Sequence, residues 1–112
     1  MPDIQEQLPL TEATFFILLS LAQGPQHGYA ILKEVEALSD GRVVLSTGTL
    51  YGALKRMLDA GWLERLEEPE PEGRERKAYR LTPFGRNLLE AETARLRSLA
   101  GIAELRLEGK RL

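Results

Sequence analysis

Hydrophobic residues recur with a helical period in two segments of the first 39 residues. The run ATFFILLSLAQ is apolar nearly all round. It predicts a helix that begins after Thr11, its N-cap, ends at Gly24-Pro25 and is buried on more than one side. A second helix is predicted in HGYAILKEVEALS, where apolar residues form a broad stripe and the charged residues fall elsewhere. That stripe consists of Tyr29, Ile31, Leu32, Val35 and Leu38.

A third helix is predicted from Ser46 or Thr47, as N-cap, to a stop at Gly61. Four apolar residues lie on one side of this helix at spacings i, i+4, i+7 and i+8, which places that side against a core. They are Leu50, Leu54, Met57 and Leu58. The opposite, outward side then carries Gly48, Thr49, Gly52, Lys55, Arg56 and Asp59, and Tyr51 lies on the flank.

Two runs with strand character follow, WLERLEE and KAYRLT. Because PEPEGRER between them contains two prolines and a glycine, it must be a loop, so the runs predict a hairpin with a long charged tip. Val43–Leu45 is a further candidate for a short strand. Thr82-Pro83 then provides an N-cap and a first-turn proline for a long helix from Phe84 to about Glu108. No linker or repeat interrupts this order, so a single mainly helical domain is expected, with residues 1–82 as its first region and residues 83–112 as its C-terminal helix.

The last helix has apolar residues over nearly half of its circumference. A chain of this size has too little core to cover so wide a band, and an exposed apolar surface of this kind marks a partner site. We therefore predict a homodimer, and Glu92, Arg95 and Arg106 are candidates for ion pairs between its subunits. The alternative is a helix that folds back entirely on its own core. The predicted dimerisation residues are Leu89, Leu96, Leu99, Ala103 and Leu107.

Composition narrows the function classes. The 112 residues include no cysteine and one histidine, so disulfides and thiolate catalysis are excluded and no metal set is evident. No nucleophile–base pairing or phosphate-cradling loop accompanies them, so neither catalysis nor a cofactor is expected. The N-terminus lacks a secretory signal, and no apolar run reaches the roughly 18 residues of a membrane span. A cytoplasmic protein without membrane contact is expected.

The net charge of −2 conceals an uneven distribution. Residues 1–41 carry six acids and one base, whereas residues 42–112 carry fourteen bases and eleven acids. Between Arg42 and Leu58 there are three bases and no acid. A polyanionic partner is therefore compatible with the acidic total, provided that the bases share a face.

The outward side of the third helix has small residues first and bases later. A helix that enters a DNA major groove, about 12 Å wide, can use such an order, because a glycine lets the backbone approach closely. Thr49 would reach base edges or a phosphate, and Lys55 and Arg56 would bind phosphates or a guanine edge. The alternative is an ordinary core helix with a polar outer side and a glycine tolerated for packing.

The hairpin favours the first interpretation. Residues 73–80, GRERKAYR, contain four bases and one acid, whereas the near side of the tip, EEPEPE, is acidic. Two helices that present a third, followed by a hairpin with a basic far side, form the winged helix-turn-helix order, in which the wing lies along the DNA backbone. Contact is assigned to Arg74, Arg76 and Lys77. The alternative is a solvated run of charges.

Three segments together resemble the PadR family of bacterial transcriptional regulators: LTEATFFILLSLAQGPQHGYAILKEVE, STGTLYGALKRMLDAGWLE and YRLTPFGR. The ordered pair GPxHGY and GTLYxxLxRxxxxGW is specific to it, and the resemblance covers roughly residues 10–107. It implies a winged-helix repressor that forms a homodimer through its terminal helices and binds an operator with inverted half-sites. The TLY-bearing helix would read the DNA, and one C-terminal helix is typical of the short subfamily.

Double-stranded DNA and a second copy of the chain are therefore the predicted partners, with a small-molecule effector as a further possibility. Some short members bind flat aromatic drugs through tryptophans on the last helix, but no aromatic residue follows Phe84 here. His27 is expected to cap or line the second helix, and Trp62 to pack at the hairpin or line an effector pocket. A winged-helix module that binds protein is the competing hypothesis. The predicted DNA-binding residues are Thr47, Gly48, Thr49, Tyr51, Gly52, Lys55, Arg56, Arg74, Arg76 and Lys77.

Overall fold

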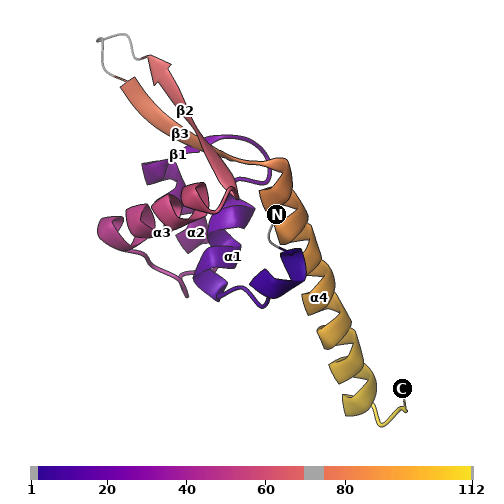
Figure 1. The fold of residues 1–112 in the computed structure, drawn as a ribbon. Helices are drawn as coiled ribbons and strands as arrows, with labels where there is room; N and C mark the ends of the chain where they lie inside the picture. The colour runs from indigo at the N-terminus through magenta and orange to yellow at the C-terminus, as the bar shows by residue number, and fades with distance from the viewer. Residues whose placement is uncertain (1–2, 70–74, 112) are drawn as a thin grey trace.

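The computed structural model describes residues 3–69 and 75–111. Its helices and hairpin follow the predicted order, but the strand expected at residues 43–45 is absent, and a short 3-10 helix and one small strand are added (Figure 1). In chain order they are η1 (Ile4–Gln7), α1 (Glu12–Ser20), β1 (Gln26–His27), α2 (Gly28–Leu38), α3 (Thr47–Asp59), β2 (Leu63–Pro69), β3 (Glu75–Leu81) and α4 (Pro83–Leu107).

Hydroxyl caps fix the starts of α1, α3 and α4. Thr11, Ser46 and Thr82 precede α1, α3 and α4, and each accepts a hydrogen bond at its side-chain oxygen from the backbone N–H three residues later, at 3.0–3.1 Å. Such a cap satisfies one of the N–H groups that a helix start leaves without a partner. Ser46 is therefore the cap of α3, and Gly61 follows its end with a φ of +80°. These boundaries confirm the predicted ones.

The core is built around α1, which packs against α2 and against the first part of α4. Ile17, Leu18 and Leu21 are at most 1% exposed, which confirms that this segment is buried on several sides. The other helices each direct one apolar face toward it. The helix residues buried there are Ile31, Val35, Leu50, Ala53, Leu54, Met57, Leu88 and Leu89, and the sheet adds Leu63 of β2 and Tyr79 of β3.

The apolar stripe of α2 is narrower than predicted. Ile31 and Val35 are fully buried, but Tyr29 is 68% exposed and Leu38 is 43% exposed. Two residues of helix correspond to a rotation of about 200°, so Tyr29 lies opposite Ile31. Its ring instead faces solvent, with the Lys33 Nζ 5.3 Å from the ring centroid. The assignment of Tyr29 to the core was wrong.

The predicted hairpin is confirmed, and a third strand joins it. β2 and β3 are antiparallel, and β1 pairs with the other edge of β3, which gives the sheet order β1-β3-β2. The hairpin rises from the helical body as a wing (Figure 1). The predicted strand at Val43–Leu45 was wrong, because this segment has no strand pairing and Val44 is 67% exposed. The β3 edge carries β1 instead.

The turn after α3 is joined to the start of α4. The Thr82 N–H donates to the Trp62 carbonyl at 3.1 Å, and the Thr82 hydroxyl donates to the Gly61 carbonyl at 2.6 Å. The first turn of α4 approaches so closely that a Cβ on Gly85 would lie 2.0 Å from the Trp62 carbonyl oxygen. Only glycine fits at residue 85 without a shift of backbone. Trp62 itself packs against the core.

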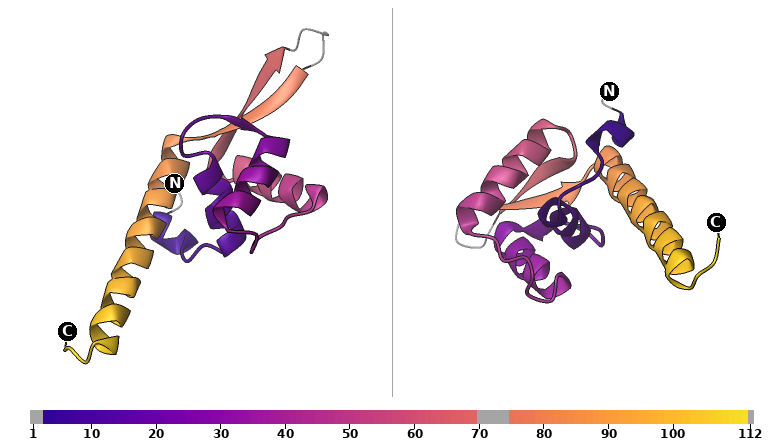
Figure 2. Two further views of the ribbon diagram at one scale, coloured as in Figure 1. Left: turned by 180° about the vertical axis from the view of Figure 1, so that it is seen from behind. Right: turned by 90° about the horizontal axis from the view of Figure 1, so that it is seen from below.

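The long helix α4 leaves the body halfway along its length. Its first half packs on the core, whereas its second half extends away from the side that carries α3 (Figures 1 and 2). Apolar side chains on this projecting half are between 38% and 87% exposed, namely Leu96, Leu99, Ile102, Leu105 and Leu107. In the part of the chain that is described, no helix is long and apolar enough to cross a lipid bilayer.

Two residues of α4 that were predicted to contact a partner subunit instead make contacts within their own chain. Leu89 is 5% exposed and belongs to the core, so little of it remains for a partner. Glu92 is 1% exposed, and it accepts a hydrogen bond from the Leu10 N–H at 2.7 Å and pairs with Arg95. The Arg95 hydrogen bond lowers the pKa of the Glu92 carboxyl against the effect of burial. An ion pair of Glu92 within the chain thus replaces the predicted one across a dimer.

Candidate nucleic-acid interface

One side of α3 is buried and the other is entirely exposed. Leu50, Ala53, Leu54 and Met57 are at most 6% exposed. This confirms the predicted orientation of the helix, while the role of its outer side stays a prediction. The exposed residues include all seven that the sequence assigned to DNA contact on this helix: Thr47, Gly48, Thr49, Tyr51, Gly52, Lys55 and Arg56.

The first turn of α3 presents polar hydrogens outward. The Ser46 hydroxyl accepts from the Thr49 N–H at 3.1 Å and donates to the Thr49 Oγ1 at 2.9 Å. Because Thr49 accepts in that second bond, its own hydroxyl proton remains able to donate to a ligand. The N–H groups of a first helical turn also favour an anion. This end of α3 is therefore suited to a phosphate or to an acceptor on a base edge.

The two glycines on the outer side of α3 are not required by packing within the chain. A Cβ on Gly48 would have no atom within 4 Å, and a Cβ on Gly52 would lie 3.7 Å from the Arg56 Nη1, an ordinary contact. Glycine inside a helix nevertheless costs about 0.5–1 kcal/mol relative to alanine. The alternative that a glycine is tolerated for internal packing is therefore not supported. A reason for glycine at these two positions would be the close approach of a ligand to the α3 backbone.

The bases of α3 follow these glycines toward the C-terminal end of the helix. Lys55 pairs with Asp59 at 3.2 Å, and their side chains are 78% and 68% exposed. An exposed pair of this spacing contributes only about 0.3–0.5 kcal/mol, so a phosphate could displace Asp59 readily. The Arg56 guanidinium lies near Gly52 and is also exposed. Both cations are thus available to a ligand.

The wing residues assigned to DNA contact are described only in part. Arg74 lies outside the described residues. Arg76 is in β3 opposite Glu68, and Lys77 is exposed and lies opposite Glu67. The strand register therefore places acidic residues of β2 opposite basic residues of β3 in this part of the wing.

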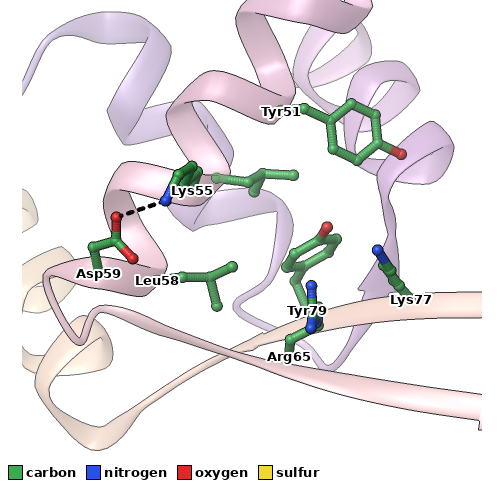
Figure 3. A pocket seen from close by; sticks show the side chains of 8 residues that line it. Tyr51, Lys55, Leu58, Asp59, Arg65, Lys77 and Tyr79 are labelled. Atoms are coloured by element: carbon green, nitrogen blue, oxygen red, sulfur yellow. Dashed lines mark hydrogen bonds and ion pairs between the residues drawn. The ribbon is translucent and has the colours of Figure 1, made fainter.

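A pocket of about 560 Å³ separates α3 from the wing (Figure 3). Arg65 of β2 lines it, although the sequence interpretation gave this residue no role. The signal that could have revealed Arg65 is its place in WLERLEE, where strand alternation puts it on the same face as the buried Leu63. The lining residues are Tyr51, Leu54, Lys55, Leu58, Asp59, Arg65, Lys77 and Tyr79.

Tyr51 lines this pocket because of a glycine on another helix. A Cβ on Gly28, the first residue of α2, would lie 2.2 Å from the Tyr51 hydroxyl oxygen and 2.8 Å from its Cζ. The Tyr51 phenol therefore occupies space that any other residue at position 28 would fill. The preceding His27 is the N-cap residue of α2, as expected, but its side chain does not make the capping hydrogen bond.

The sequence model of the transcriptional regulator PadR-like family matches residues 17–91, which is more than half of the chain. The chain belongs to the PadR-like family. A curated relative of this PadR-like chain is an uncharacterized 37.1 kDa protein in transposon TN4556 of Streptomyces fradiae, 43% identical over 90 residues. The match spans 80% of the PadR-like chain but only 24% of that relative's length.

Solved structures of PadR proteins share the fold. A PadR family transcription regulator from Clostridium difficile R20291 superposes with a TM-score of 0.72 at 26% identity, covering 87% of this chain and 99% of that one. Bacillus subtilis PadR, solved in complex with operator DNA, superposes with a TM-score of 0.63 at 24% identity, covering 70% of this chain and 44% of that one. The PadR-like chain is thus a winged-helix protein of a family of transcriptional regulators.

Proposed function

We propose that this PadR-like protein is a sequence-specific DNA-binding repressor that acts as a homodimer on an operator with inverted half-sites. The observation that carries the proposal is the outer side of α3. It presents two glycines that internal packing does not require, followed by two exposed bases, Lys55 and Arg56. A major groove accounts for both features, since it needs close approach of backbone and attracts positive charge.

The fold supports the same use of α3. In winged-helix proteins the third helix enters the major groove and the wing follows the backbone beside it. Here α3 and the wing border the same pocket, so one ligand could contact both (Figure 3). The Bacillus subtilis PadR structure with operator DNA shows that a protein of this fold binds DNA. By analogy, the DNA ligand of this chain would lie against α3 and the wing.

The dimer is inferred from the projecting half of α4. Its leucines and Ile102 are between 38% and 87% exposed, and an isolated monomer would leave this apolar surface in contact with water. A second copy packed along this half would bury them and place the two α3 helices on one molecule. Two readers about 34 Å apart would meet successive major grooves on one face of DNA. A small-molecule effector stays a prediction of the family resemblance.

The experiment is a binding titration by fluorescence anisotropy on the DNA upstream of the protein's own gene. The wild type should bind this DNA far more tightly than a scrambled duplex of equal length. Log affinity should fall linearly with log salt concentration as phosphate counterions are released. Arg56→Ala should weaken binding and flatten that slope by about one unit for each lost phosphate contact.

Lys110→Ala is the matched control, because this base pairs with Glu108 beyond the end of α4 and far along the chain from α3. It should leave both affinity and slope unchanged. If no duplex binds better than the scrambled one, the DNA-reading proposal fails and the protein-binding alternative takes its place. If Arg56→Ala and Lys110→Ala behave alike, DNA binds elsewhere than at α3.

A further inference from the structure

The pocket between α3 and the wing gathers bases from three separate elements. Lys55 comes from α3, Arg65 from β2 and Lys77 from β3 (Figure 3). Arg65 lies directly opposite Tyr79 in the strand register, and Lys77 precedes Tyr79 by two residues. Because side chains alternate between the faces of a strand, all three wing residues project from the same face, toward α3. The folded chain thus brings together charges that are far apart in sequence.

The acidic residues near these bases form only weak, exposed ion pairs with them. Asp59 pairs with Lys55 at 3.2 Å and Glu67 with Arg65 at 3.6 Å, and all four side chains are between 44% and 78% exposed. Exposed pairs of this kind contribute little, so a stronger anionic acceptor can replace the carboxylates. Among the described residues, none forms an ion pair with Lys77. Lys77 is also exposed, so an anion can reach it.

Two phenols complete the lining. Burial raises the pKa of the Tyr79 phenol above its ordinary value, and nearby Tyr51 raises it further while Arg65 opposes the shift. Tyr79 is therefore a neutral hydroxyl at physiological pH and can donate a hydrogen bond to an anion. Tyr51 stands at the other side of the opening, where the absence of a side chain on Gly28 leaves room for its hydroxyl. Leu54 and Leu58 add apolar side chains to the lining.

We propose that this pocket is a phosphate site, in which Arg65 and Lys77 bind the phosphate oxygens and Lys55 and Tyr51 close the opening from α3. A phosphate carries the charge that the three bases attract and several acceptor oxygens for the arginine and phenol donors. The pocket opens beside the exposed side of α3, so the phosphate of a DNA backbone would reach it. The DNA backbone as the source of this phosphate rests on the proposed function. A free phosphorylated molecule is the other source of the same chemistry.

The first experiment replaces the phosphates of the upstream DNA one at a time by uncharged methylphosphonates. With the wild-type protein, neutralising the phosphate that occupies the pocket should lower affinity about tenfold, as expected for one charge-assisted contact. Arg65→Gln should lower affinity by a similar factor on unmodified DNA. On DNA with that one methylphosphonate, Arg65→Gln should cost nothing more, because the shared contact is already absent.

Arg80→Gln is the control, since Arg80 lies on the opposite face of β3 from Lys77, is paired with Glu64 at 2.6 Å and does not line the pocket. It should show no coupling to any methylphosphonate position. Gly28→Ala is a second variant that removes no charge. It should displace the Tyr51 phenol and weaken binding, and the added effect should vanish in a Tyr51→Ala background.

The second experiment uses inorganic phosphate without DNA, at constant ionic strength, and follows binding by NMR shifts of the Arg65 and Lys77 side chains. Coupling in the first experiment assigns the pocket to the DNA backbone. Saturable phosphate shifts that Arg65→Gln abolishes, without that coupling, assign it to a free phosphorylated ligand. If neither occurs, the phosphate site is wrong. The upstream DNA binding of the wild type is measured independently, so its presence would leave the proposed function standing.

Discussion

Replacing Gly52 by alanine is expected to stabilise the fold while weakening DNA binding. Gly52 lies inside α3 and is exposed, and an added Cβ would meet only the Arg56 Nη1, at 3.7 Å. Alanine is favoured over glycine in a helix interior by about 0.5–1 kcal/mol. For a chain of this length that gain corresponds to a rise in Tm of about 2–5 °C.

The same methyl group should be harmful at the interface. If the α3 backbone at Gly52 lies against the floor or wall of a major groove, the Cβ holds the helix away and lengthens its contacts. The loss of one good base contact costs about 1–3 kcal/mol, which is about 5- to 150-fold in affinity. Gly52→Ala would therefore raise stability and lower DNA affinity. A substitution that only disturbed folding would lower both.

The assays are thermal unfolding by circular dichroism and anisotropy titration on the upstream DNA. Gly101→Ala is the matched control, because Gly101 is inside α4, its added Cβ would have no atom within 4 Å, and it lies opposite Leu99 on that helix. It should raise Tm by a similar amount and leave affinity unchanged. A Gly52→Ala protein that is more stable and binds DNA like the wild type would refute the close-approach reasoning.

Three further outcomes are expected. Glu92→Gln should lose about 2 kcal/mol of stability to urea at neutral pH, because the Arg95 ion pair is broken. The pKa of Glu92 is lowered in the folded protein. The difference in unfolding free energy between wild type and Glu92→Gln should therefore have its full size above the ordinary carboxyl pKa, and it should shrink as the pH falls through the lowered pKa. Gly85→Ala should cost about 1–3 kcal/mol by the same measurement, because its Cβ would overlap the Trp62 carbonyl. Leu99→Glu should shift sedimentation toward monomer at micromolar concentration and weaken DNA binding together with it, whereas an unchanged dimer would place the interface elsewhere.

Local signals in the sequence were sufficient for most of the helical framework. A hydroxyl cap acts on an N–H three residues away, so Thr11, Ser46 and Thr82 could be recognised without the fold. The buried side of α3 also followed from its spacing alone. The hairpin followed from two alternating runs and a loop that contains prolines. In each case, the sequence signal lies in the same helical turn, helix or hairpin that it predicts.

What the sequence missed depends on distant contacts. β1 is two residues long, so it has no periodicity, and only the open edge of β3 makes it a strand. Glu92 was expected at a dimer interface because its partner, the Leu10 N–H, is 82 residues away. Arg65 was overlooked in an acidic run: strand alternation puts it on the same face as Leu63, but only the packing of the wing brings that face next to α3. The need for glycine at position 28 likewise becomes visible only when Tyr51 is in place.

The close joint between Gly61, Trp62, Thr82 and Gly85 ties the last turn of α3 to the first turn of α4. With its 25 residues α4 is about 37 Å long, so it acts as a lever with its pivot at this corner. Turning α4 by about 10° about that corner would carry its far end through roughly 6 Å, a distance estimated from that helical rise. In the proposed homodimer, the angle at which two copies cross along α4 would conversely set the orientation of both α3 helices, because a Cβ on Gly85 would already overlap the Trp62 carbonyl at this corner.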